Sequence, residues 1–291
     1  MKIVCLTAVH QRREITGIFY HAFADQRVRA LKQGIDLSLQ VVASEPEDIA
    51  LANQYGHTPA EAPNLPLGAK HNTGLDHAMA QDFDYLMQLG SDDFICDSFW
   101  LNKDVQQALQ QQVPIFGFNN LLVMHATEHK MKTSNFLRPF GAGRFIHRSL
   151  LDGAVYCKAV RWKDGYSGKD YQRGKGFVEV LPLSRIRAAQ HEILSDDIHL
   201  QLWEPNKNAG LDYSSESRLI WVHGMDKARC RVLPGKEMVM DVKTGSNIHS
   251  YDKLPGTELS DFQYDMVCND FSFVRSIEDT YKGRGGRNRQ C

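Results

Sequence analysis

Two adjacent carboxylates, Asp92 and Asp93, follow a short apolar run, and such a pair is typical of a site that binds a metal ion and a phosphate group. The run is Tyr85-Leu-Met-Gln-Leu89, and Gly90 and Ser91 separate it from the carboxylates. Acidic groups held side by side repel one another unless a cation neutralises them, and Mg²⁺ and Mn²⁺ prefer oxygen ligands. A solvated turn or a helix cap explains the pair equally well, so neighbouring elements must decide.

The elements that position these carboxylates alternate between strand and helix. Apolar runs predict buried strands at residues 3–9, 37–43 and 85–89. A helical repeat of apolar side chains predicts helices at residues 13–33, 45–55 and 66–81. This alternation predicts right-handed crossovers and a mainly parallel sheet, whose ligand lies beyond the carboxyl ends of its strands. The chemistry is therefore expected near Val9, Ser44 and Gly90.

The second half of the chain follows a different pattern. Further strands are predicted at residues 114–118 and 121–124, and residues 141–151 read as a strand leading into a helix. Helices are expected near residues 189–203 and from Tyr213. From about Pro234 the sequence is polar and predicts a loop-rich region. We therefore expect a domain over residues 1–233 and a C-terminal extension over residues 234–291 that packs on the active site or closes it.

The composition indicates an ordered globular protein without a strong electrostatic bias. Hydrophobic residues make up 42% and charged residues 24%, and 34 basic against 35 acidic side chains give a net charge of −1. No global field therefore draws the chain to nucleic acid or anionic membrane, although basic clusters at residues 161–175 and 282–289 leave local nucleic-acid binding open. The six cysteines are scattered and read as reduced thiols. No apolar run approaches the ~20 residues of a transmembrane helix, so a cytoplasmic location is expected.

The segment before the carboxylates reads Leu67-Gly-Ala-Lys-His-Asn-Thr-Gly-Leu-Asp-His-Ala-Met-Ala80. It resembles family 2 glycosyltransferases, whose A-type fold has a Gly/Ala-Arg/Lys-x-Asn-x-Gly helix start, an alanine, and a strand ending in Leu-Asp-x-Asp-Asp. The matching positions are Gly68, Lys70, Asn72, Gly74, Ala78 and Gly90-Ser91-Asp92-Asp93. The resemblance covers roughly residues 1 to 230. It implies a GT-A-like α/β fold, with a Rossmann-type mixed, mainly parallel sheet flanked by helices, and a nucleotide-sugar donor such as a UDP-sugar.

The resemblance also implies roles for individual residues. Lys70 and Asn72, with Gly68 and Ser91 of the same motifs, would contact the donor's diphosphate or sugar, whereas Asp92 and Asp93 would hold the ribose and Mn²⁺ or Mg²⁺. The remaining donor-site residues lie in the first strand and its polar exit or at the end of the second strand, and they would face the nucleotide base or ribose: Thr7, Ala8, Arg12, Ser44 and Glu45.

Gly90 departs from the family pattern, because it stands where the motif has its first aspartate. A metal ion at Asp92 and Asp93 would then profit from a third ligand in the second half of the chain. His223 and His249 are candidates, although either histidine can equally be an ordinary core or surface residue.

An inverting sugar transfer also needs a base that takes the proton of the acceptor hydroxyl. Asp212 is the preferred residue, because it follows Gly210 at an expected helix start, with Glu216 within about a turn. An ordinary helix cap explains Asp212 equally well, and Asp196-Asp197 is a competing acidic pair.

Two rival functions remain open from the sequence. A nucleotidyltransferase shares the parallel sheet and the acidic site, but it should carry a glycine-rich phosphate loop after the first strand, and residues 10–14 contain no glycine. A non-catalytic nucleotide-sugar-binding or scaffold protein would explain the missing first aspartate. The acceptor can be a glycan, a lipid-linked saccharide, a protein or a modified nucleic acid.

Overall fold

The computed structural model describes residues 1–64, 67–135, 141–151, 160–162, 177–180, 230–233, 237–244 and 251–282. The helices expected near residues 189–203 and from Tyr213 lie outside these ranges. Within them, no helix is long and apolar enough to cross a membrane.

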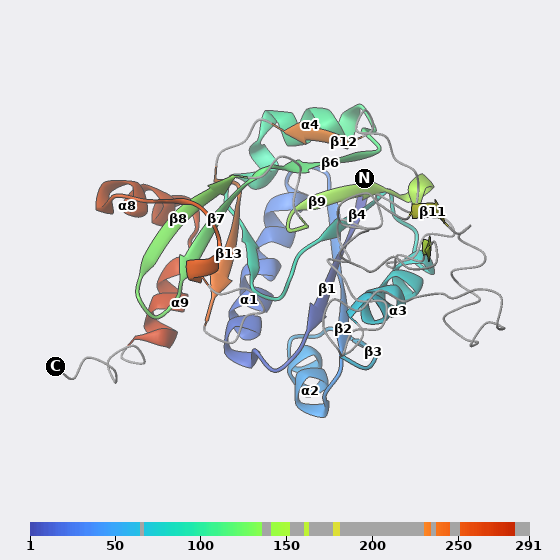
Figure 1. Ribbon diagram of the computed structural model, residues 1–291, viewed down its shortest axis with the longest axis horizontal. Coiled ribbons are helices and arrows are strands. Elements are labelled where there is room, and N and C mark those ends of the chain that lie inside the picture. The colour runs from blue at the N-terminus through green and yellow to red at the C-terminus, as the bar shows by residue number, and fades with distance from the viewer. Residues whose placement is uncertain are drawn as a thin grey trace.

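The first ninety residues form the alternating elements that the sequence predicts. Their bounds are β1 Lys2–Val9, α1 Arg13–Leu31, β2 Asp36–Ala43, α2 Pro46–Gln54, β3 Ala60–Glu61, α3 Leu67–Met79 and β4 Tyr85–Gln88. Strand β1 pairs in parallel with β2 on one side and with β4 on the other. The carboxyl ends of all three strands therefore lie at one edge of the sheet (Figure 1).

The main sheet is mixed and mainly parallel, which confirms the predicted fold class. Within the described ranges its strand order is β12-β6-β9-β4-β1-β2-β3. The added strands are β6 Ile115–Phe118, β9 Arg144–His147 and β12 Cys230–Leu233. Among the described strands of this sheet, only β9 is antiparallel to its neighbours, β4 and β6. The strand predicted within residues 141–151 is β9, and it leads into a 3₁₀ turn, η2 Arg148–Leu150.

A second sheet packs beside the first and carries the C-terminal region. Its order in the described chain is β14-β8-β7-β13-β5. The bounds are β5 Asp93–Ile95, β7 Asn120–His125, β8 Lys130–Asn135, β13 Val239–Lys243 and β14 Thr257–Glu258. In Figure 1 this sheet lies with α8 and α9 on the side of the molecule away from α3. The remaining elements are η1 Phe99–Leu101, α4 Lys103–Gln110, β10 Val160–Trp162, β11 Phe177–Val180, η4 Tyr251–Lys253, α8 Asp261–Asp270 and α9 Val274–Tyr281.

The prediction of a loop-rich region after Pro234 is wrong for the described residues. This part of the chain contains β13, α8 and α9. Helix α8 begins with a capping box in which Ser260 and Gln263 satisfy each other's backbone. Helix α9 buries Val274, Ile277 and Tyr281 along one face. Polar composition concealed these short elements, and the division at residue 233 stays a prediction.

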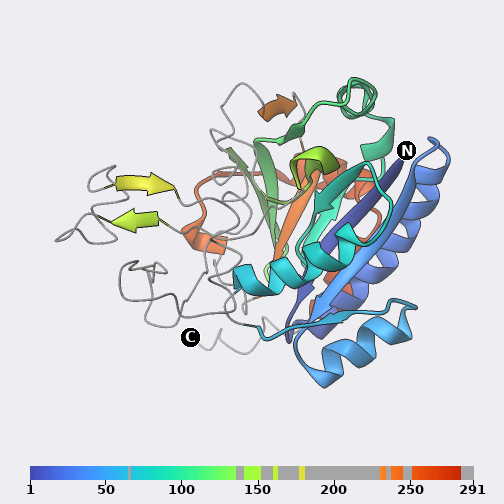
Figure 2. The same ribbon diagram turned by 90° about the vertical axis from the view of Figure 1, so that its right-hand side faces the viewer.

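The two faces of the main sheet are covered by different helices. Because successive strand residues point to opposite faces, Ile3 and Cys5 pack with α1, whereas Val4 and Leu6 pack with α3. Figure 2 shows the sheet between these two helices. A Cβ atom at Gly74 would clash with Leu6 and Val42, so this glycine lets α3 lie directly on the sheet.

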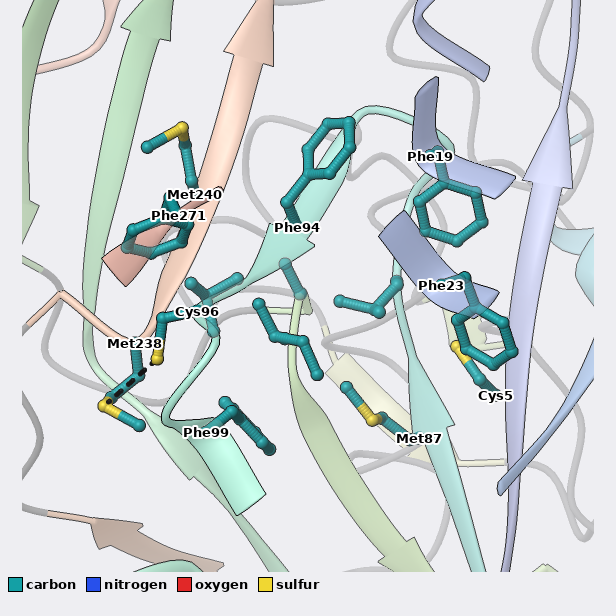
Figure 3. Close-up of a cluster of buried hydrophobic side chains, with 14 of the residues drawn as sticks. Cys5, Phe19, Phe23, Met87, Phe94, Cys96, Phe99, Met238, Met240 and Phe271 are labelled. Carbon is teal, nitrogen blue, oxygen red and sulfur yellow. Dashed lines mark hydrogen bonds between the residues drawn. The ribbon is translucent and has the colours of Figure 1, made fainter. Parts of the chain in front are cut away.

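The strand that starts at Asp93 is anchored in the core by its second residue. The ring of Phe94 lies 6.1 Å from that of Phe19 in α1 and stacks at 4.2 Å on Phe273 before α9, as centroid distances. Figure 3 shows Phe94 directed towards Phe19, within the same core as Phe271 and Met240. This packing fixes the backbone beside Asp92 and Asp93.

Candidate functional site

The candidate site lies where the loops after β1 and β4 face each other. Strands β2 and β4 flank β1, so the chain leaves β1 towards one side and β4 lies on the other, which is the arrangement that opens a ligand crevice in parallel sheets. Arg12, after β1, reaches across to the loop after β4. Its Nη1 forms an ion pair with the Asp92 carboxylate, and its Nη2 lies 3.5 Å from Ser91 Oγ.

Gly90 allows the two predicted carboxylates to turn back towards it. The Gly90 N–H donates to Asp93 Oδ2 at 2.6 Å. A Cβ atom at Gly90 would lie 2.8 Å from Asp93 Oδ2 and 2.9 Å from Asp92 Oδ1. A larger residue at position 90 would therefore displace the carboxylates that follow.

A third carboxylate, Asp241, joins the pair, and sequence reasoning missed it. Strand β13 pairs antiparallel with β5 and places Asp241 opposite Asp93, while Val242 N–H donates to the Asp92 carbonyl at 2.9 Å. Lys243 Nζ contacts Asp241 Oδ2 at 2.5 Å. The strand-like alternation of Val239-Met-Asp-Val-Lys243 was the available signal, but it does not reveal the partner strand.

The proximity of these groups perturbs their ionisation. Burial, followed by the charge of Asp92, raises the pKa of Asp241 to about 6, although Lys243 acts in the opposite direction. Burial and the charges of Asp241 and Asp92 raise the pKa of Asp93 well above its ordinary value, against the opposing effect of the Gly90 N–H. Burial is the larger cause of both shifts, and the neighbouring carboxylates add to it.

The cluster suits a hard divalent cation. Three carboxylates face two cations, Arg12 and Lys243, which leaves a formal charge of −1 when all are ionised. Asp241 Oδ1 is buried and has no hydrogen-bond partner among the described residues. Oxygen ligands of this kind match Mg²⁺ or Mn²⁺ in type, although among the described residues only His10, Glu45 and Asp48 bring three ligand atoms within 4.8 Å of one another. The other predicted ligands, His223 and His249, lie outside the described residues.

A second group of side chains that can bind metal ions lies after strands β1 and β2. Ligand atoms of His10, Glu45 and Asp48 lie within 4.8 Å of one another. However, Asp48 accepts from the Gln11 N–H at 3.0 Å and from Arg13 Nε at 3.2 Å, and Glu45 accepts from Gln11 Nε2 at 2.7 Å. These contacts make the group a clamp that holds the loop after β1, in which Gln11 has a left-handed φ of 58°.

Lys70 lies at the same edge of the sheet, but it is directed at the backbone. Its Nζ donates to the Val9 carbonyl at 2.5 Å and lies 3.3 Å from Asn64 Oδ1. Burial lowers the pKa of Lys70 to about 8, against the opposing charge of Asp48. Burial and the Lys70 charge also lower the pKa of the neighbouring His71 to about 4, so this histidine is neutral at pH 7.

Some of the other predicted site residues lie in the elements at this edge of the sheet, and some lie outside the described residues. Gly68 and Asn72 lie in α3, and Asn72 is buried. Thr7 and Ala8 lie in β1, with Thr7 fully buried. The hydroxyls of Thr7 and Ser44 have no hydrogen-bond partner in the described part of the chain. The predicted catalytic residues Asp212 and Glu216 lie outside it.

Comparisons with known proteins give only distant likenesses. No family model matches the chain, and no curated protein matches it. Residues 1–349 of S. aureus TarS in complex with UDP-GlcNAc share 12% identity with a TM-score of 0.39, covering 98% of this chain and 72% of that one. A CMP:2-keto-3-deoxy-manno-octonic acid synthetase complexed with CTP shares 10% at a TM-score of 0.37, covering 92% and 98%.

A cytidylyltransferase from Leptospira borgpetersenii shares 15% identity at a TM-score of 0.32. The match covers 52% of this chain and 61% of that one, so this chain spans less than two thirds of its length. Likenesses at this level carry no functional argument, and the function must be inferred from the site itself.

Proposed function

We propose that this protein is a glycosyltransferase that moves a sugar from a nucleoside-diphosphate donor to an acceptor hydroxyl with the help of a divalent cation. The observation that carries this proposal is the convergence of Asp92, Asp93 and Asp241 beyond the carboxyl end of β4, next to Arg12 after β1. A UDP-sugar is the first donor to test, and Mn²⁺ or Mg²⁺ the cation. The resemblance in the helix and strand motifs points the same way.

The chemistry requires charge compensation for the leaving diphosphate. The acceptor oxygen attacks the anomeric carbon, the bond from that carbon to the diphosphate oxygen breaks, and the nucleoside diphosphate leaves. A cation held by the three carboxylates would neutralise part of the charge on the diphosphate. Arg12 and Lys70 add positive charge at the same edge, where burial strengthens electrostatic interactions.

The proton of the acceptor hydroxyl needs a separate base, for which we propose Asp212, with Glu216 close by in the sequence and Asp197 as the competitor. A base at a helix start is favoured in its ionised form by the helix dipole. In an inverting reaction, this carboxylate takes the hydroxyl proton as the new glycosidic bond forms.

The proposal is tested by thermal unfolding with a panel of nucleotide-sugars, with and without Mn²⁺. A donor that binds the folded state raises its stability, by about 2.7 kcal/mol at a concentration of 100 times Kd. We expect Mn²⁺-dependent stabilisation of the wild type, and its loss in Asp92→Asn and Asp93→Asn. Asp82→Asn is the matched control, because Asp82 is 86% exposed and pairs with Lys2 away from the site. If Mn²⁺ and the donor raised the stability of all variants equally, the assignment of the site to Asp92 and Asp93 would be wrong.

The rival functions differ in their products. A glycosyltransferase releases UDP from a UDP-sugar, a nucleotidyltransferase releases pyrophosphate from a nucleoside triphosphate and a sugar phosphate, and a binding protein releases neither. The loop after β1 supports the first reading, since its Gln11 N–H is occupied by Asp48 at 3.0 Å and is not available to cradle phosphates. Pyrophosphate release without UDP release would favour the nucleotidyltransferase.

A further inference from the structure

We propose that Arg12 is a built-in counter-ion of Asp92 and that the donor's diphosphate draws it away, so that nucleotide and divalent cation bind cooperatively. This inference rests on the proposed function and assigns Arg12 to the diphosphate and not to the nucleotide base.

The Arg12–Asp92 pair joins the segment after β1 to the turn after β4. Arg12 is the N-cap residue of α1, after β1, and Asp92 lies in the turn after β4. Between them, the ion pair and the 3.5 Å contact to Ser91 Oγ place the guanidinium over the end of β4. The Arg12 side chain is 23% exposed and that of Asp92 10%, so the pair is largely withdrawn from solvent. The guanidinium is thus paired with the carboxylate that a divalent cation would need as a ligand.

The neighbouring cations have other partners. Lys243 Nζ lies against Asp241, and Lys70 Nζ donates to the Val9 carbonyl. Of these three described cations, Arg12 is the one whose movement uncovers neither Asp241 nor the end of β1, whereas Lys70 can contribute its charge from where it lies. The Arg12 guanidinium also suits a diphosphate, because its planar, forked set of N–H groups can donate hydrogen bonds to two phosphate oxygens at once.

The charges explain why the two ligands should help each other. A guanidinium and a divalent cation on one carboxylate repel, so Arg12 weakens cation binding in the absence of nucleotide. A diphosphate that accepts from Arg12 removes the guanidinium from Asp92 and brings further oxygen ligands for the cation. By linkage, the cation then raises the affinity for the diphosphate by the same factor as the diphosphate raises the affinity for the cation.

The experiment measures Mn²⁺ binding by electron paramagnetic resonance of the free ion, with and without UDP, after correction for the Mn²⁺ that UDP binds in a protein-free sample. In the wild type, we expect UDP to tighten Mn²⁺ binding by about tenfold or more, within the usual range of coupling between sites. In Arg12→Gln, Mn²⁺ alone should bind about tenfold tighter than in the wild type, UDP alone should bind more weakly, and the coupling should approach unity. Arg12→Lys keeps the charge without the fork and should retain part of the coupling.

Arg29→Gln is the matched control, because Arg29 forms a comparable pair with Asp97 at 3.1 Å, outside the site. It should keep the wild-type coupling, and thermal unfolding should show that each variant is folded. If Arg12→Gln binds Mn²⁺ no tighter than the wild type while Asp92→Asn loses Mn²⁺, the counter-ion role is wrong and the metal site stands. If Asp92→Asn also binds Mn²⁺ normally, both the counter-ion role and the metal site of the proposed function are overturned.

Discussion

Replacing Asp93 by asparagine should stabilise the ligand-free protein, although it should impair donor binding. Asp93 lies between the charges of Asp92 and Asp241, and its pKa is raised well above the ordinary value by burial and by those charges. Asparagine has nearly the same shape, and its Oδ1 can still accept from the Gly90 N–H, which donates to Asp93 Oδ2 at 2.6 Å. The substitution therefore removes a repelling charge without removing the hydrogen bond.

The size of the stabilisation can be worked out from the pKa of the neighbouring carboxyl group, Asp241. The rise in the pKa of Asp241 from 3.8 to about 6 corresponds to about 3 kcal/mol of unfavourable folding free energy for its ionised form. Burial is the first cause of that rise and the charge of Asp92 the next, and the charges of Asp241 and Asp92 likewise act on Asp93, so loss of the Asp93 charge should recover only part of this free energy, about 1–2 kcal/mol. For domains of this general size, that raises Tm by about 2–8 °C.

The pH dependence identifies the cause. A carboxyl with a raised pKa disfavours folding when ionised, so the cost is present at pH 8 and disappears as the carboxyl takes up its proton at lower pH. Thermal unfolding at pH 8 and pH 5, without metal, should therefore show Asp93→Asn above the wild type at pH 8 and a much smaller gap at pH 5. Asp92→Asn should give no such gain, since it leaves Arg12 without its partner. A lower Tm for Asp93→Asn at pH 8, or the same gap at both pH values, would refute the reasoning.

Three further outcomes can be measured on the donor that the thermal screen identifies. Lys70→Met should weaken diphosphate binding by about 1.5–3 kcal/mol at pH 7, as measured by calorimetry. The wild type, unlike this variant, should lose affinity as the pH rises past about 8, where Lys70 loses its proton. A wild-type affinity that does not change with pH would contradict this prediction. Asp212→Asn should lower turnover by roughly 10²–10⁴ with donor affinity nearly intact, whereas collapse in Glu216→Gln alone would move the base there. Gly90→Ala should reduce Mn²⁺-dependent donor binding, because its Cβ would lie 2.8 Å from Asp93 Oδ2. Gly17→Ala, whose Cβ would lie 3.4 Å from the Tyr55 hydroxyl, should not; equal binding in both would contradict the crowding argument.

The elements of the first ninety residues could be predicted because their signals are local. Continuous apolar runs mark β1, β2 and β4, and a helical repeat marks α1, α2 and α3. The sequence also located Asp92 and Asp93 after a strand, since the apolar run stops at Leu89. Short elements in polar segments were harder, and the region holding α8 and α9 was wrongly interpreted as loop-rich.

The partners of the carboxylates could not be predicted, because they depend on strands that are distant in the sequence. Asp241 reaches Asp93 only through the antiparallel pairing of β13 with β5, and Arg12 reaches Asp92 only because β4 lies beside β1. Nor does the motif explain Gly90, whose missing side chain leaves room for two carboxylates.

The sequence by itself determined the alternating order of strands and helices, the mainly parallel sheet and the place of the acidic pair at its edge, because each follows from patterns within a few residues. The tertiary structure alone decided that Asp241 completes the acidic cluster, that Arg12 neutralises Asp92, and that Lys70 is turned to the Val9 carbonyl. These contacts depend on which distant strands pair and how their side chains pack, and such choices are made by the whole core and not by any local run of residues.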